Sequence, residues 1–173
     1  MSTFYTKDKL EFLTVAVETC KFLEHAGELE KSDFVSKMTK LLPLLYLKTA
    51  MVQVSEDVSD DEPERFVTEV EYAQLRAQLA DLLGDSDDYL DSFDTNMAFS
   101  DTTLAATISE DLADVYQALK DYASCCQLGD EQVMNDALFV CINDFQNYWG
   151  ARLLGALRAL HVVSVAPESD EHN

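Results

Sequence analysis

Residues 131–161 read EQVMNDALFVCINDFQNYWGARLLGALRALH, an apolar run that contains no proline and holds the single tryptophan of the chain, Trp149. Its large apolar residues recur at steps of three and four, the spacing that places side chains on one face of an α-helix. The members of this face are Leu138, Cys141, Phe145, Trp149, Leu153, Leu157 and Leu160. Such a helix is about 45 Å long, so we expect every other element to pack along it.

A second helix is predicted over residues 103–128, directly before this run. Its apolar residues repeat at steps of four and three, the seam spacing of a bundle helix. They are Ile108, Leu112, Val115, Leu119, Tyr122 and Cys126. Thr107 and Glu110 have the spacing of a capping box, which would move the start of the helix beyond residue 103. Gly129 and Asp130 leave a short turn with Asp130 as N-cap, which predicts that the two helices are antiparallel neighbours.

Two further helices are predicted before residue 54. The first covers Thr6–His25, with an apolar face of Leu10, Leu13, Val17 and Cys20, widened by Phe12, Ala16 and Leu23. The second is expected to be capped by Ser32 and to kink or restart at Pro43, which removes a backbone donor. The segment PLLYLKTAMV that follows is apolar on nearly all sides, and we expect it to lie centrally.

The middle of the chain is polar and acidic. Residues 54–65 (VSEDVSDDEPER) are predicted to form a disordered or mobile loop. Residues 68–71 (TEVE) have the pattern of a capping box, and the helix they open is expected to end near Gly84. The next piece, residues 85–94, is predicted to be a helical turn or irregular, and residues 96–100 to be a loop.

The predicted fold class is all-α, a single-domain antiparallel bundle of five to six helices with a long C-terminal helix. Only five glycines and three prolines occur in 173 residues, fewer than the many turns of an all-β protein usually need. The bundle is expected to cover residues 1–166. Residues 167–173 form a polar tail that is expected to fray.

The charge is uneven along the chain. The net charge is −21, of which residues 55–101 carry −13, while residues 1–54 are neutral. A surface so acidic disfavours nucleic acid and anionic membranes as partners, because both need a basic face. It remains compatible with simple solubility, with a basic protein partner, with divalent cations or with mimicry of DNA. The neutral first third and the acidic middle could also pair across a homodimer.

The cellular compartment is predicted from the lack of membrane-spanning and signal-peptide patterns and from the cysteines. No run of eighteen apolar residues occurs, and the first residues lack the apolar core of a signal peptide. The four cysteines are Cys20, Cys125, Cys126 and Cys141, and all lie in apolar helical contexts without a C-x-x-C pair. We interpret them as small buried hydrophobes in a reducing compartment, so a soluble cytoplasmic protein is expected.

The strongest candidate for chemistry is the carboxylate cluster of Glu110, Asp111 and Asp114, with Asp121 two turns further on. Asp111 and Asp114 share one helix face, and converging carboxylates in a bundle can hold Mg²⁺ or Mn²⁺. A second acidic pair of the kind that metal-dependent nucleotide hydrolases use is missing. Glu110 and Asp111 would also favour the dipole of a helix that starts near Thr107. Metal binding and a purely structural role both stay open.

Three other patterns are weaker. The acidic run at Asp85, Asp87 and Asp88 fails the calcium-loop pattern and predicts a solvated turn. The histidines His25, His161 and His172 lack the E-x-x-H motifs of a di-iron bundle. Tyr148-Trp149-Gly150 predicts core packing or an interface anchor. The arginines that follow it, Arg152 and Arg158, are candidates for ion pairs with Asp111 or Asp114 of the neighbouring helix.

Four segments resemble a bacterial domain-of-unknown-function family that is found mainly in Bacteroidetes. They are Leu41–Lys48, Leu82–Asp94, Ile108–Tyr122 and Asn135–His161. The resemblance covers nearly the whole chain and implies a small all-helical cytoplasmic protein. It carries over no catalytic residue, cofactor or partner.

The sequence contains neither a nucleophile elbow nor a phosphate-binding loop. We therefore expect no catalytic residue, no cofactor and no resident metal. The predicted function is a non-enzymatic interaction or regulatory module that binds another protein, with the acidic middle segment as part of its surface. The alternative is a divalent-metal-dependent nucleotide hydrolase built on Glu110, Asp111 and Asp114.

Overall fold

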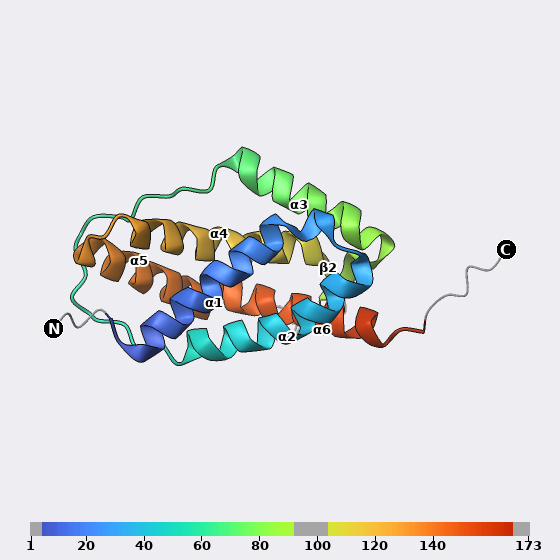
Figure 1. Ribbon diagram of the computed structural model, residues 1–173, viewed down its shortest axis with the longest axis horizontal. Coiled ribbons are helices and arrows are strands. Elements are labelled where there is room, and N and C mark those ends of the chain that lie inside the picture. Colours follow the sequence, from blue (N-terminus) through green and yellow to red (C-terminus); the bar gives the residue numbers. More distant parts are fainter. Residues whose placement is uncertain (1–4, 92–103, 168–173) are drawn as a thin grey trace.

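The predicted antiparallel pair lies at the centre of the computed structural model, which describes residues 5–91 and 104–167. α4 (Ile108–Gln127) packs against α5 (Glu131–Asp144), and the chain continues through η4 (Phe145–Trp149) into α6 (Gly150–Val165). Around this unit lie α1 (Lys7–Glu24), α2 (Lys31–Ala50) and α3 (Glu69–Leu83), as Figure 1 shows. The all-α bundle is confirmed. Among the described residues, no helix is long and apolar enough to cross a lipid bilayer.

The turn between α4 and α5 has the predicted chemistry. Gly129 adopts a φ of 74°, a left-handed conformation that residues with a Cβ adopt at a cost. The Asp130 carboxylate then accepts hydrogen bonds from the backbone N–H groups of Gln132 and Val133, at 2.9 and 3.2 Å. Asp130 is therefore the N-cap of α5, and the antiparallel arrangement follows from this short link.

The final apolar run is helical throughout but not regular. η4 is one turn of π-helix, which the apolar spacing does not predict. It is closed by the N–H of Gly150, which donates to the carbonyl of Phe145. A Cβ on Gly150 would collide with that carbonyl, so glycine fits this position. Trp149 is fully buried, as predicted for a core residue, and its indole N–H donates to the carbonyl of Cys141 at 3.0 Å.

Helix α1 is confirmed, with Thr6 as its N-cap, but its buried face is rotated from the prediction. Phe12, Ala16 and Leu23 form the core-facing side, whereas Leu10 is exposed. Phe12 sets this orientation because its ring stacks on Tyr122 of α4, with centroids 5.5 Å apart. The helical period predicts an apolar face on α1, and the contact with α4 decides which residues of that face are most deeply buried.

Helix α2 differs from the prediction in three ways. It begins at Lys31 after Glu30, so Ser32 is not its N-cap, and it continues through Pro43 without a break. The segment PLLYLKTAMV is not central, because α2 is an outer helix that contacts α1 and α6 and leaves its outer side to solvent. The large residues on that outer side are Leu44, Leu47 and Met51.

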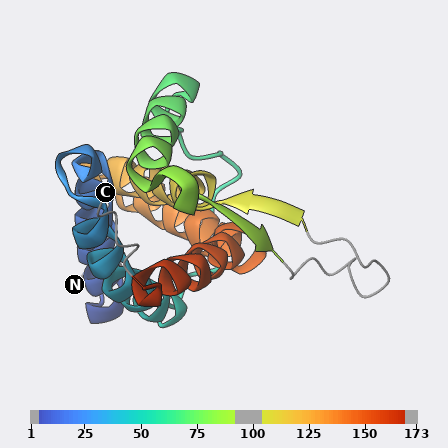
Figure 2. The same ribbon diagram turned by 90° about the vertical axis from the view of Figure 1, so that its right-hand side faces the viewer.

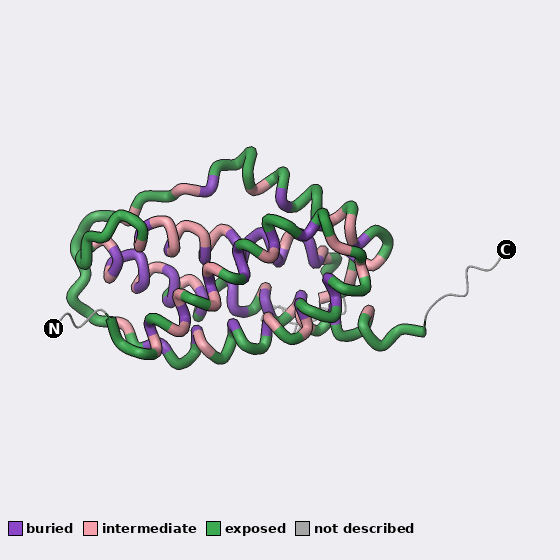
Figure 3. Tube along the Cα trace, viewed as in Figure 1, coloured by how far each residue is buried: buried purple, intermediate pink, exposed green. Residues whose placement is uncertain are grey.

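Residues 52–67, here named the strap, join α2 to α3 along the α4–α5 pair. The predicted absence of helix is confirmed, but the predicted disorder is wrong. The N–H and hydroxyl of Ser59 donate to the carboxylate of Asp136 on α5. The N–H groups of Phe66 and Val67 donate to Asp121 on α4, at 2.8 and 2.9 Å. These bonds fix the strap although most of its residues are exposed (Figure 3).

Helix α3 starts at the predicted capping box of Thr68 and Glu71 and ends at Gly84, which has a φ of 56°. The chain then forms the 3-10 turn η2 (Gly84–Ser86); a similar turn, η1 (Ala26–Glu28), separates α1 from α2.

The two antiparallel strands β1 (Asp88–Asp91) and β2 (Leu104–Thr107) were not predicted. They lie at one edge of the bundle, beside α6 (Figure 2). Strand β2 occupies the residues expected to open α4, so the helix starts after Thr107, as the capping box indicated. The expected loop at residues 96–100 and the tail beyond Pro167 fall outside the described residues.

Candidate functional site

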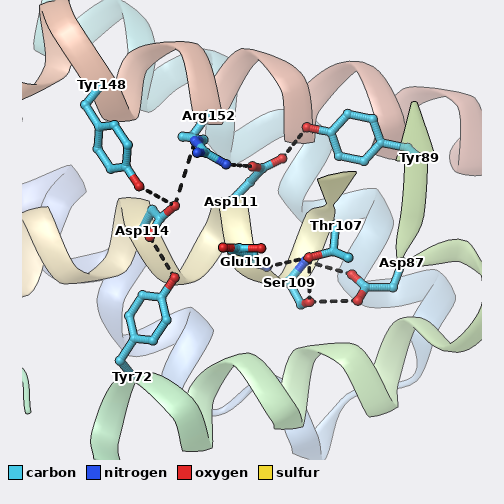
Figure 4. A network of polar contacts seen from close by, with 10 residues as sticks. All are labelled: Tyr72, Asp87, Tyr89, Thr107, Ser109, Glu110, Asp111, Asp114, Tyr148 and Arg152. Atoms are coloured by element: carbon cyan, nitrogen blue, oxygen red, sulfur yellow. Dashed lines mark hydrogen bonds and ion pairs between the residues drawn. The ribbon is translucent and has the colours of Figure 1, made fainter. Parts of the chain in front are cut away.

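Two buried carboxylates stand at the start of α4 and form the centre of a polar network (Figure 4). The hydroxyl of Thr107 accepts from the N–H of Glu110 at 3.2 Å and so caps the helix. Asp111 and Asp114 follow in the first two turns and lie on one face, as their spacing predicts. Asp111 is 1% exposed and Asp114 is 8% exposed. Charges buried to this degree require compensating partners.

Asp111 is held from β1 and from α6. The hydroxyl of Tyr89 donates to its Oδ2, and Nη1 of Arg152 lies 3.4 Å from its Oδ1. Burial raises the pKa of Asp111 to about 6, against the opposing effects of the Tyr89 hydrogen bond and the Arg152 charge. The desolvation of this carboxylate therefore outweighs the stabilisation of its charge by its two partners.

Asp114 is held from α3 and η4. The hydroxyl of Tyr72 donates to Oδ1 at 2.7 Å, and that of Tyr148 donates to Oδ2 at 3.0 Å. Arg152 completes the set, with its Nε 3.9 Å from Oδ2 and its guanidinium 5.2 Å from the Tyr148 ring centroid. Burial and the bond to Asp114 raise the pKa of Tyr72 far above its ordinary value, so its phenol remains a donor.

A third buried carboxylate, Asp87, fixes the other side of the same helix start. It accepts hydrogen bonds from the N–H and the hydroxyl of Ser109, both at 2.7 Å. The prediction of a solvated acidic turn is therefore wrong for Asp87, although Asp85 and Asp88 are exposed. Arg158 also departs from the ion-pair hypothesis, because it donates to the carbonyl of Leu90 at 2.6 Å instead.

The network joins α3, β1, η4 and α6 to the start of α4. Each central carboxylate already accepts a tyrosine hydroxyl and forms an ion pair with Arg152, which leaves neither as a free base. Among residues 5–91 and 104–167, no three acidic, histidine or cysteine side chains are grouped so that they could hold a metal ion. The geometry favours a structural role for Asp111 and Asp114. Sequence reasoning did not connect the three tyrosines with these carboxylates, because each tyrosine lies on a different element from its carboxylate.

Gly155 gives a direct test of how tightly the network is packed. A Cβ on this residue would lie 2.5 Å from the hydroxyl oxygen of Tyr89 and would displace it from Asp111. We expect Gly155→Ala to lower the free energy of unfolding by about 1 kcal/mol. This figure is the destabilisation from overpacking minus the stabilisation from the higher helix propensity of alanine. Urea denaturation measures this loss. The same change in a Tyr89→Phe background should cost clearly less, and equal costs would contradict the steric explanation.

Asp121 lies on the same helix as the central carboxylates but faces the strap. Its Oδ1 accepts the two strap N–H groups, while its Oδ2 is buried without a hydrogen-bond partner. The hydroxyl of its neighbour Tyr122 is also buried and lies beside the thiol of Cys126. Both residues line a cavity of about 220 Å³ between the strap, α4 and α5. This second site was not predicted, because the strap that covers it was expected to be disordered.

The cysteines behave as predicted for small apolar side chains. All four are free thiols; Cys20, Cys125 and Cys141 are buried, and Cys126 is partly exposed. Burial raises the pKa of Cys20 to about 12 and that of Cys126 to about 11. Thiols with such pKa values carry little thiolate at neutral pH and are poor nucleophiles.

Comparison with known proteins agrees with the resemblance seen in the sequence. Protein BF1032 from Bacteroides fragilis, a structural genomics target with a crystal structure, is 41% identical to this chain with a TM-score of 0.85. The match covers 97% of this chain and 99% of that chain. The search of curated proteins found no match. The model of one family, described as a domain of unknown function, matches residues 3–166. The chain therefore belongs to the family DUF5063.

Proposed function

We propose that this protein is a non-enzymatic interaction module that binds a basic segment of another protein along the strap. The observation that carries the proposal is an ordered row of exposed acids with Arg65 as the basic residue among them. The acids are Glu56, Asp57, Asp60, Asp61, Glu62 and Glu64. A basic segment laid along this row would be attracted over its whole length.

The anchoring of the strap supports this proposal. Besides the bonds to Asp121 and Asp136, the carbonyl of Asp57 accepts from the side-chain amides of Gln132 and Asn135 on α5. A row of charges that is already fixed in place loses little conformational entropy when a partner binds. The same acids on a disordered loop would lose much more.

A fluorescent oligolysine peptide tests the proposal by anisotropy at low and moderate salt. We expect binding that weakens with salt, and about tenfold weaker binding after neutralising four strap acids. The substitutions are Asp60→Asn, Asp61→Asn, Glu62→Gln and Glu64→Gln. The matched control removes four exposed acids from α1, η1 and the start of α2. Its substitutions are Glu18→Gln, Glu28→Gln, Glu30→Gln and Asp33→Asn.

Equal weakening by the two sets would show a general charge effect and contradict a site on the strap. The molar mass in solution is measured on the same samples, because a homodimer paired through the acidic segment would cover the strap.

A thermal-shift series with Mg²⁺, Mn²⁺ and nucleotides tests the alternative of a metal-dependent hydrolase. A ligand at 100 times its Kd would stabilise the protein by about 2.7 kcal/mol.

A further inference from the structure

The outer face of α2 carries an apolar stripe that the rest of the described chain leaves exposed. Leu44, Leu47 and Met51 follow one another at steps of three and four, so their side chains lie on one side of the helix. They are 42%, 54% and 46% exposed. Steps of three and four are also the spacing with which one helix packs on another in a coiled coil. The stripe is therefore a surface on which a further helix can pack.

The charge of α2 is opposite in sign to that of the whole protein. The helix contains four lysines and one aspartate, a net charge of +3, whereas the chain carries −21. Lys37 and Lys40 continue the stripe toward the start of the helix, again at steps of three and four before Leu44. Among the described residues neither forms an ion pair, whereas Lys48 pairs with Glu11 at 2.7 Å.

The other end of the stripe leads into acidic residues. The strap begins directly after Met51, and its first acids, Glu56 and Asp57, are exposed. The carbonyl of Asp57 accepts from the side-chain amides of Gln132 and Asn135. These acids are thereby held at the end of the bundle where α2 ends and α5 begins (Figure 1). Along this side of the molecule lysines, apolar residues and acids follow one another in that order.

We propose that α2 pairs with α2 of a second copy of this chain, antiparallel across a twofold axis that passes between Leu44 and Leu47. The pairing is self-complementary, because the order of lysine, apolar residue and acid on one copy meets the reverse order on the other. At a rise of 1.5 Å per residue, Lys37 lies about 13 Å from the axis, and Ala50 at the helix end lies about 7 Å from it. Lys37 therefore extends past the end of the other helix, where the first strap acids of that copy follow.

The apolar stripe supplies the attraction in this dimer, and the charges select the orientation. Exposed ion pairs add little stability, whereas a parallel arrangement would place lysines beside lysines. Two chains of net charge −21 repel each other, and this repulsion is weakest where the positively charged α2 faces the other copy. The dimer covers the outer face of α2 and the first acids of the strap, and it does not depend on the proposed function.

Analytical ultracentrifugation over a range of protein concentrations tests the dimer. We expect the parent protein to show a monomer–dimer equilibrium. Leu47→Glu should raise the dissociation constant about tenfold or more, because the new charge occurs twice beside the axis. The matched control is Val70→Glu on α3, a 64% exposed residue on a helix that lies away from α2 in Figures 1 and 2. It should leave the dissociation constant unchanged. A parent that stays monomeric, or equal weakening by both changes, would overturn the proposal.

Exchanging the charges tests the antiparallel orientation. Lys37→Glu with Lys40→Glu should weaken the dimer about tenfold, and so should Glu56→Lys with Asp57→Lys. The second variant separates local pairing from overall repulsion, because it makes the net charge less negative and yet is expected to weaken association. All four changes in one chain restore opposite charges across the axis and should return the dissociation constant to within about threefold of the parent.

The changed side chains are all exposed, so each variant should keep the Tm of the parent within a few degrees, which thermal unfolding checks. A four-site variant that dimerises no more tightly than the two-site variants would overturn the antiparallel pairing. Tighter association of the Glu56→Lys and Asp57→Lys variant than of the parent would overturn it as well, because overall charge alone would then control the dimer.

Discussion

Replacing Trp149 with alanine is expected to lower the free energy of unfolding by about 4 kcal/mol, the largest single effect we predict. Trp149 is fully buried and packs against Phe145, with ring centroids 4.7 Å apart. Truncation leaves a cavity where η4 meets α6 and removes the donor to the carbonyl of Cys141. Urea denaturation monitored by far-UV circular dichroism measures the loss, because the variant has no tryptophan fluorescence.

The control for this prediction is Leu154→Ala on α6, where the side chain is about half exposed. That change should alter the free energy of unfolding by about 0.5 kcal/mol or less. A loss for Trp149→Ala as small as that of the control would mean that the tryptophan does not anchor the last two helices.

Replacing Arg152 with methionine is expected to lower the free energy of unfolding by about 2 kcal/mol at pH 8. The change leaves Asp111 and Asp114 without their positive partner inside the network. Breaking a buried ion pair typically costs about 3–5 kcal/mol. We expect less here because the Arg152 side chain is 39% exposed and the tyrosine donors remain. Urea denaturation at two pH values measures the effect.

The pH dependence of this loss identifies its cause. The pKa of Asp111 is about 6 in the folded protein, above its ordinary value, so at pH 5 its carboxyl is mostly protonated and needs no counterion. The deficit of Arg152→Met should therefore be smaller at pH 5 than at pH 8. The control Arg158→Met, which removes a bond to the Leu90 carbonyl, should cost about 1 kcal/mol or less at both pH values. A deficit that does not change with pH would contradict the role assigned to Asp111.

Local chemistry made several elements predictable. The capping residues Thr68 and Asp130 and the positive φ of Gly129 act within a few residues of their own position. The strands were missed because residues 104–107 pair with β1, which lies more than ten residues earlier in the chain. A short-range sequence pattern does not reveal such a pairing. The buried face of α1 was misplaced because Phe12 packs on a ring from α4, more than a hundred residues further on.

The sequence by itself determined the helices, their order and the antiparallel pair of α4 and α5, because helical period, caps and a short link are local properties. It also placed Asp111 and Asp114 on one face. Only the tertiary structure decided what those carboxylates do. Their tyrosine donors stand 22, 34 and 42 residues away, and folding alone brings them together. The ordered strap and the cavity below it were likewise decided by the tertiary structure. Both depend on hydrogen bonds from strap N–H groups to Asp121, which lies 54 residues or more away in the sequence.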